Sequence, residues 1–301
     1  MSSLSLSRRM VMGLALSVAA FPLSAQDHPT VAATSYPLAY FAERLGAGAV
    51  DVIFPVPAGI DPSFWRPGVS DITAIQGANV IALNGAGFAT WPTKASLPRS
   101  RTVDTSAGFS DRLIRTETVT HSHGEDGEHS HTATASYTWL DFLLASEQAD
   151  TLADAMIRQI PERTAEIERE RDALLADLSA LDDRARSVTD DAAFGPVITS
   201  HPRYQYFARA YDLTFHSVDW DAREEPSEDQ WAALKAMIAD TAATAFIWEA
   251  APSQAAHDRI IEFGLASVVF PPLANVPEDG DFLNEMHSSL DQIEAASGEN
   301  Q

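Results

Sequence analysis

Four of the nine histidines in this 301-residue chain lie within eleven residues, at positions 121–131. They form two His-Ser-His pairs around three acidic residues and two glycines, and they are His121, His123, His129 and His131. Imidazole is a good ligand for zinc, copper and nickel, and carboxylates add charge and oxygen donors. Because glycine keeps a segment flexible, we expect this one to capture a metal ion and release it. The alternative is a solvated acidic loop whose histidines are incidental.

A second group of polar residues follows predicted strands or the histidine segment. In open α/β sheets, ligands bind at the carboxyl ends of the strands. Five residues of these loops could bind or orient a ligand: Asp61, Ser63, Tyr137, His201 and Glu249. If the strands belong to two lobes, their ends meet, and we expect these loops to line one interlobe cleft.

Short apolar runs that end in turn residues alternate with helical patterns along the chain. The runs predict strands of a first lobe at residues 30–33, 50–55 and 79–83, and strands of a second lobe at residues 196–200, 213–218, 244–248 and 266–270. Helical spacing falls between them, at residues 38–45, 204–210, 228–241 and 254–263. We therefore predict an α/β fold with two lobes, each with a mostly parallel sheet flanked by helices.

A stretch of different composition separates the two lobes. Residues 146–186 are rich in Ala, Glu, Leu and Arg and contain no glycine. Leu152, Met156 and Ile160 repeat at helical spacing, and the pattern continues after Pro161. We predict one long helix or two, kinked or restarted near Pro161, that join the lobes as a stiff spine. A helical hairpin without a hinge role is the alternative. The predicted division is a signal peptide at 1–25, a first lobe at 26–145 with a histidine-rich loop at 120–134, a linking helix at 146–189 and a second lobe at 190–301.

The amino-terminal 25 residues have the order of a signal peptide. Arg8 and Arg9 precede an apolar run, and small residues follow at a cleavage site. This predicts periplasmic export through the Sec pathway, or the Tat pathway given the paired arginines. The chain has no cysteine, so we expect no disulfide, no thiolate ligand and no lipid anchor. Its 43 acidic and 20 basic residues give a net charge of −23, which argues against binding nucleic acid or an anionic membrane.

Five segments carry a resemblance to a known family. They are Asp61-Pro62-Ser63-Phe64-Trp65-Arg66-Pro67, Asn84-Gly85-Ala86-Gly87-Phe88, Tyr137-Thr138-Trp139-Leu140-Asp141, Thr199-Ser200-His201 and Phe246-Ile247-Trp248-Glu249. In this order they resemble the substrate-binding proteins of zinc and manganese ABC uptake systems, the ZnuA-like family. The resemblance implies a monomer that delivers a metal ion to an ABC transporter permease. Zinc is the expected ion, with manganese or another divalent metal as the alternative.

The resemblance also places four metal ligands in the cleft, and this chain departs from the family at three of them. His201 is kept, whereas Ser63, Tyr137 and Pro271 stand at the other positions. A neutral hydroxyl is a poor zinc ligand, and a tyrosine must lose a proton with a pKa of about 10 to coordinate. Glu249 matches an acid that supports the family's site. His201 is therefore either a remaining ligand or a histidine hydrogen-bonded within the cleft.

These observations favour the periplasmic substrate-binding component of a metal ABC importer, with ion capture by the histidine-rich loop and the interlobe cleft. A divergent periplasmic metal chaperone or buffer, or a binder of another small ligand, is the alternative, and each would have lost the central metal site. Ser63 and His201 could be imagined as a nucleophile and its base. No G-x-S-x-G motif is present, however, so we expect no enzymatic activity.

Overall fold

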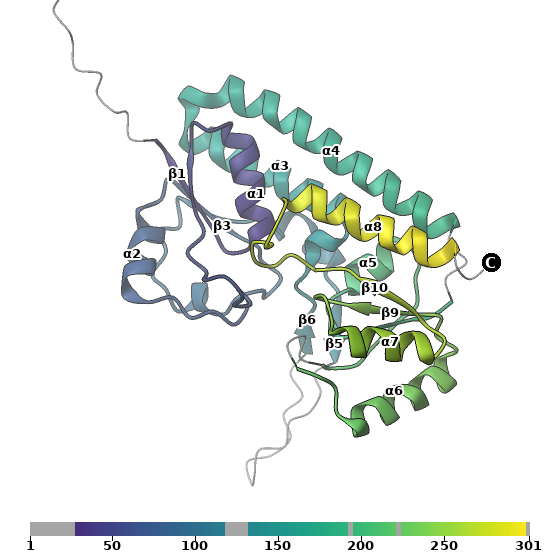
Figure 1. The fold of residues 1–301 in the computed structure, drawn as a ribbon. Coiled ribbons are helices and arrows are strands. Elements are labelled where there is room, and N and C mark those ends of the chain that lie inside the picture. Colours follow the sequence, from purple (N-terminus) through teal and green to yellow (C-terminus); the bar gives the residue numbers. More distant parts are fainter. Residues whose placement is uncertain (1–27, 118–131, 192–194, 221–223, 299–301) are drawn as a thin grey trace, which may run out of the picture.

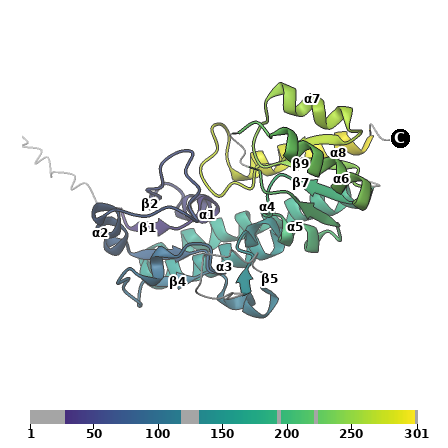
Figure 2. The ribbon, with the colours of Figure 1, turned by 90° about the horizontal axis from the view of Figure 1, so that it is seen from below.

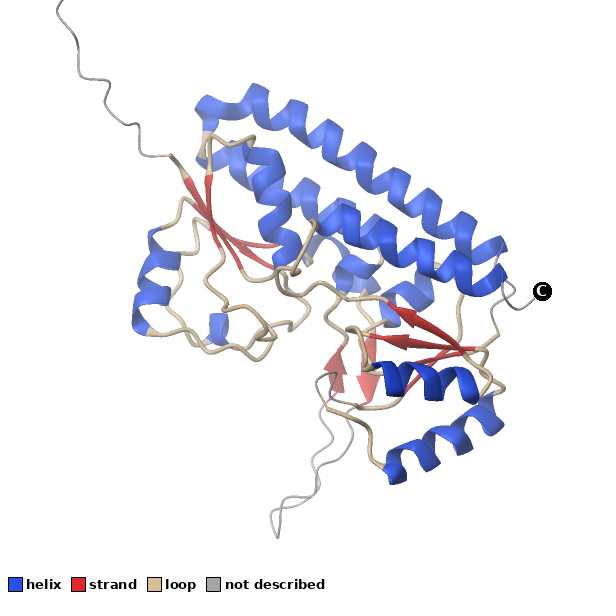
Figure 3. Cartoon of the chain, viewed as in Figure 1, coloured by secondary structure: helices blue, strands red, loops and turns tan. Residues whose placement is uncertain are grey.

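The computed structural model describes residues 28–117, 132–191, 195–220 and 224–298. The predicted signal peptide lies outside the described residues, as do His121, His123, His129 and His131. Within the described ranges, the strands form two four-stranded sheets and one two-stranded sheet, with helices around them (Figure 3). The predicted α/β class with two lobes is confirmed.

The first lobe is built on a parallel sheet in the order β2-β1-β3-β4. Its strands are β1 (Thr30–Ala33), β2 (Asp51–Ile53), β3 (Val80–Leu83) and β4 (Thr102–Asp104). Helix α1 (Tyr36–Gly46) connects β1 to β2, and α2 (Val69–Gly77) connects β2 to β3. The apolar runs predicted three of these strands. They did not predict β4, because Thr-Val-Asp holds a single apolar residue.

The second lobe repeats this arrangement with the order β10-β9-β7-β8. Its strands are β7 (Val197–Thr199), β8 (Phe215–Ser217), β9 (Ala245–Trp248) and β10 (Ala266–Val269), and its helices are α5 (Gln205–Ala210), α6 (Glu228–Thr241), α7 (Gln254–Glu262) and α8 (Phe282–Gly298). In the first sheet, β1 has β2 on one side and β3 on the other. In the second sheet, β7 has β8 on one side and β9 on the other. In parallel sheets a ligand crevice forms at such a reversal, between β1 and β3 and between β7 and β9.

Two helices follow the first lobe and lie against each other. Helix α3 (Phe142–Gln159) begins at Asp141, whose carboxylate accepts the Leu144 N–H at 3.2 Å. It ends just before Pro161, which lacks an N–H, and after one 3₁₀ turn (Pro161–Arg163) helix α4 (Thr164–Asp191) begins. The predicted restart near Pro161 is therefore found. Helices α3 and α4 contact each other and form a helical hairpin, the arrangement considered as the alternative to a single stiff spine.

Helix α4 nevertheless links both lobes. At 1.5 Å per residue its 28 residues span about 42 Å. It contacts α1 and α3 beside the first sheet and α8 beside the second (Figures 1 and 2). Helix α8 in turn reaches the first lobe, since the Phe282 ring lies 5.5 Å from Phe41 and 5.7 Å from Tyr40, centroid to centroid. In the described part of the chain, every helix is too short or too polar to span a bilayer.

Candidate functional site

Loops that follow strands of both sheets converge on one arginine. Asp61 follows β2 and Tyr137 follows the hairpin of the first lobe, whereas Arg203 follows β7 and Glu249 follows β9. The Arg203 Nη2 lies 2.9 Å from Asp61 Oδ2, and its Nε lies 2.8 Å from Glu249 Oε2. The Arg203 side chain is only 14% exposed. A single guanidinium thus forms ion pairs with a carboxylate of each lobe in largely desolvated surroundings.

Tyr137 completes the surroundings of this guanidinium. Its hydroxyl donates to Asp61 Oδ2 at 3.1 Å and accepts a hydrogen bond from Arg203 Nη1. The guanidinium carbon lies 4.8 Å from the centre of the Tyr137 ring, a cation–π contact. Burial raises the pKa of Tyr137, Arg203 opposes this, and Asp61 adds to it. The group is a neutral phenol at neutral pH, and a phenolate metal ligand is not favoured here.

Arg203 keeps its charge in this environment. Burial lowers the pKa of Arg203, but Tyr137, Glu249 and Asp61 outweigh that effect, and the pKa is raised overall. The cluster therefore holds one cation against two acidic groups. Arg203 lies between the carboxylates, where a divalent ion would also have to lie, and would repel it.

Ser63 is bonded within its own loop, whereas Glu249 is bonded to the neighbouring loop after β7. The Ser63 hydroxyl donates to Asp61 Oδ1 at 2.7 Å, and the Ser63 N–H donates to the same oxygen at 2.8 Å. The Glu249 N–H donates to Ser200 Oγ at 3.0 Å, which joins the loops after β9 and β7. Ser63 therefore helps to hold Asp61 in the orientation in which it contacts Arg203.

His201 lies at the edge of this cluster. Its Nδ1 donates to the Trp220 carbonyl at 3.0 Å, and its Nε2 lies 3.1 Å from Asp219 Oδ1. Glu249 Oε1 is farther from Nδ1, at 3.9 Å. Both ring nitrogens thus have partners in the second lobe, as expected of a histidine hydrogen-bonded within the cleft. Among the described residues, no group of three or more His, Asp or Glu side chains is arranged to hold a metal ion.

The structure brings together four of the five cleft residues considered from the sequence, Asp61, Ser63, Tyr137 and Glu249, with His201 beside Glu249. Pro271, at the fourth family position, follows Phe270, whose carbonyl accepts the Tyr204 hydroxyl. Sequence reasoning missed Arg203. The available signal was the position of Arg203 two residues after His201, in a loop that follows a strand. A basic residue there can neutralise the acidic residues of the other loops.

The histidine segment connects two strands that the apolar runs did not predict. Strands β5 (Arg115–Glu117) and β6 (Thr132–Thr134) pair antiparallel, with Glu117 opposite Thr132, so the described residues on either side of the segment are paired. Tyr206 of α5 fixes this hairpin to the second lobe. Its hydroxyl accepts the Ile114 N–H at 3.2 Å and donates to the Ala135 carbonyl at 3.0 Å.

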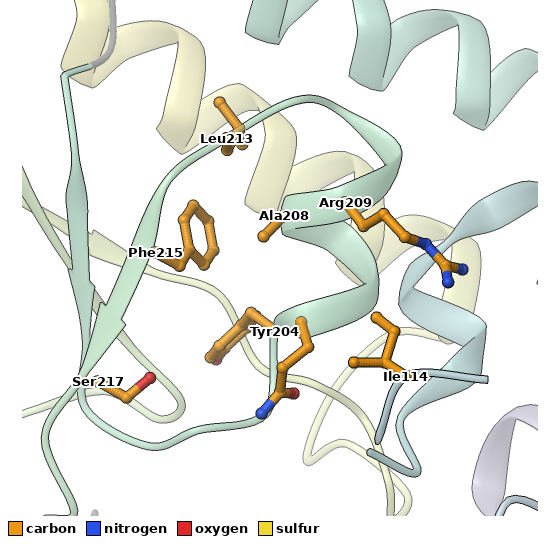
Figure 4. A pocket seen from close by; sticks show the side chains of 8 residues that line it. Ile114, Tyr204, Ala208, Arg209, Leu213, Phe215 and Ser217 are labelled. Carbon is orange, nitrogen blue, oxygen red and sulfur yellow. The ribbon is translucent and has the colours of Figure 1, made fainter. Parts of the chain in front are cut away.

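A cavity of about 410 Å³ lies beside this attachment, between α5 and β8 (Figure 4). Ile114 contributes to its wall together with Ala208, Leu213 and Phe215, and none of the predicted site residues lines it. The wall is mainly apolar, and it does not offer the carboxylates or imidazoles that a divalent metal needs.

Comparison with known proteins places this geometry in a family. The family model described as "Zinc-uptake complex component A periplasmic" matches residues 31–296. The high-affinity zinc uptake system protein ZnuA of Bacillus subtilis is 25% identical over 278 residues, which cover 89% of this chain and 87% of that protein. The zinc-binding lipoprotein AdcA of Streptococcus pneumoniae is 23% identical over 267 residues; these cover 86% of this chain but 53% of AdcA, so the chain spans about half of that relative.

Solved structures share the fold. The metal-dependent lipoprotein YcdH of Bacillus subtilis has a TM-score of 0.75 at 22% identity, covering 89% of this chain and 99% of that one. The Zn(II)-bound ZnuA-like domain of Streptococcus pneumoniae AdcA has a TM-score of 0.74 at 18% identity, covering 90% and 99%. Since the family model spans both lobes, the chain belongs to the family of periplasmic A components of zinc-uptake complexes, as the sequence resemblance implied.

Proposed function

We propose that this protein is the periplasmic substrate-binding component of a metal ABC importer, that zinc is its cargo, and that His121, His123, His129 and His131 provide most of its affinity. Family membership over residues 31–296 carries the proposal. Relatives described as zinc-binding or zinc-uptake proteins support zinc as the cargo. The permease of an ABC transporter is then the partner, and the net charge of −23 attracts cations to the protein.

The cleft supports capture by the histidine segment. Arg203 already supplies a positive charge between Asp61 and Glu249, and His201 is engaged by Trp220 and Asp219. The segment offers four imidazoles and three carboxylates on a hairpin connection. Zinc binds neutral imidazole, so we expect affinity to weaken as the pH falls through about 6.5. Membership of a family of uptake components supports a binding role rather than an enzymatic one.

Calorimetric zinc titration of the exported chain tests this proposal. The test variant has all four segment histidines replaced by serine, and the control carries His287→Ala, an exposed histidine on α8. We expect the four-serine variant to lose most zinc binding and the control to keep it. His201→Ala should have a small effect. Tight one-to-one binding that survives in the four-serine variant and disappears in His201→Ala would overturn the proposal.

A metal buffer or chaperone is the second candidate, and the arginine in the cleft favours it, because such a protein needs no central site. Growth under zinc limitation separates the two. An importer component restores growth only when its permease is present, whereas a buffer acts without one.

A further inference from the structure

Arg203 forms an ion pair between the two lobes at the strand ends, and a second ion pair within its own lobe. Asp61 belongs to the first lobe, and Arg203 and Glu249 belong to the second. Both carboxylates are largely buried, with 24% and 16% of their side chains exposed. Charged groups are rarely buried without a partner of opposite sign. This crevice therefore requires a cation, and the chain itself supplies one.

We propose that Arg203 acts as an internal cation that replaces a bound divalent metal in the interlobe cleft. It holds the lobes together with no ion bound and excludes metal from the cleft, and its removal creates a metal site at Asp61 and Glu249. This deepens the proposed function, because it assigns the cleft a role separate from that of the histidine segment. It also stands on its own, since it depends only on the described residues of the cleft.

The position of Arg203 at the sheet reversal supports this assignment. Arg203 follows β7 and Glu249 follows β9, the two strands between which a ligand crevice is expected. The guanidinium reaches from there to Asp61 and Tyr137 of the other lobe. It thus occupies the place of a ligand while being part of the chain.

The charges show what its removal would do. Without Arg203, two largely buried carboxylates lose the cation that both contact, beside a neutral Tyr137 hydroxyl. Like charges in such a site repel, and a bound divalent cation would relieve that repulsion. Carboxylates and water suit manganese and magnesium, and His201, 3.9 Å from Glu249, adds an imidazole that suits zinc.

Metal titration of the full chain tests the proposal. All variants carry serine at the four segment histidines, so that only the cleft is measured, and ZnCl₂ and MnCl₂ are the probes. We expect the parent to show no one-to-one binding, and Arg203→Ala to bind one ion at least 100-fold more tightly. Arg203→Lys, which keeps a positive charge, should not bind. Adding Glu249→Gln to Arg203→Ala should abolish the gain.

Arg209→Ala is the matched control. Arg209 lies on α5 and also reaches the first lobe, where its Nη2 lies 3.4 Å from Asp141 Oδ2, but it lies outside the cleft cluster. It should gain no metal binding. Circular dichroism confirms that each variant is folded, and Arg203→Gln replaces Arg203→Ala if the latter unfolds.

Small-angle X-ray scattering measures whether the two lobes move apart, through the radius of gyration. The parent should keep its radius of gyration when metal is added, and Arg203→Ala should expand without metal and contract with it.

Two results would overturn the inference. One is a folded Arg203→Ala or Arg203→Gln that binds no more metal than Arg209→Ala. The other is one-to-one binding by the parent that Glu249→Gln removes, since the cleft would then accept metal despite Arg203. Neither depends on the histidine segment. Failure of the proposed function would instead appear as zinc binding that is insensitive to loss of the four segment histidines.

Discussion

Replacing Arg203 with methionine should lower the free energy of unfolding, because Asp61 and Glu249 then lose their ion pairs. Methionine keeps much of the apolar stem and removes the charge, so Asp61 and Glu249 lose their shared partner. Removing one partner of a buried ion pair costs about 3–5 kcal/mol. Because the side chains here are 14–24% exposed, we expect the lower end, about 3 kcal/mol. In a chain of this size that lowers the melting temperature by about 6 °C.

The loss of stability in Arg203→Met should come from the charges of Asp61 and Glu249 that are left without a partner. Removing those charges as well measures this contribution. Arg203→Met with Asp61→Asn and Glu249→Gln leaves no unpaired charge, so most of the lost stability should return. A double-mutant cycle of Arg203→Met with Asp61→Asn, the partner in the other lobe, should give a coupling of about 1–3 kcal/mol. Urea unfolding in the presence of EDTA is the assay, which keeps metal out of the comparison.

Arg169→Met is the control, because Arg169 pairs with Glu170 on the surface of α4 and is 66% exposed. Such a pair contributes little, and we expect a change within about 0.5 kcal/mol. If Arg203→Met cost no more than this control, or if the effects of Arg203→Met and Asp61→Asn were additive, the guanidinium would not hold the lobes together.

Three further predictions concern the scaffold. Tyr206→Phe leaves the part-buried Ile114 N–H and the buried Ala135 carbonyl without their partner, so it should cost about 1–3 kcal/mol and speed amide exchange in β5 and β6. Unchanged exchange would contradict the attachment. Burial raises the pKa of Tyr211, so above about pH 10 the unfolded chain loses this proton while the folded chain keeps it, and stability falls as the pH rises. Tyr211→Phe should flatten that fall by up to about 1.4 kcal/mol per pH unit in urea unfolding, and an unaltered slope would count against the burial. Gly85→Ala should destabilise by more than about 1 kcal/mol in thermal melts, because φ is +73° and the new Cβ would lie 1.9 Å from Asp104 Oδ1; the control Gly77→Ala, with open space around it, should not.

Among the described residues, the apolar runs between turn residues predicted every strand of the two four-stranded sheets except β4, edge strands included. Strand β9, for example, is buried at all four positions and was predicted from residues 244–248. Strands β4, β5 and β6 were missed because Thr-Val-Asp, Arg-Thr-Glu and Thr-Ala-Thr contain no apolar run. Helix α8 was not predicted, although its sequence contains a helical pattern. Its buried apolar residues recur at helical spacing, at Phe282, Met286, Leu290 and Ile293.

The site was predictable only in part for a related reason. Parallel strands place the residues that follow them at one edge of a sheet, and this brought Asp61 and Glu249 into the same cleft. The direction of the Arg203 side chain depends on two carboxylates, Asp61 and Glu249, that lie more than 40 residues away in the sequence. Local sequence patterns do not encode that direction. The assignment of His201 as a metal ligand remains a prediction.

The contact between α8 and α1 gives the molecule an order of assembly. Phe282 covers Phe41 and Tyr40 of α1, so the interior of the first lobe is completed by residues that the ribosome adds after the sheet of the second lobe. Such distant pairings are slow to form, because the loop between them must close before the contact gains anything. The first lobe thus cannot finish folding as an independent unit while the second is being made. Loss of α8 would leave aromatic rings of the first lobe uncovered, although every residue of its sheet was present.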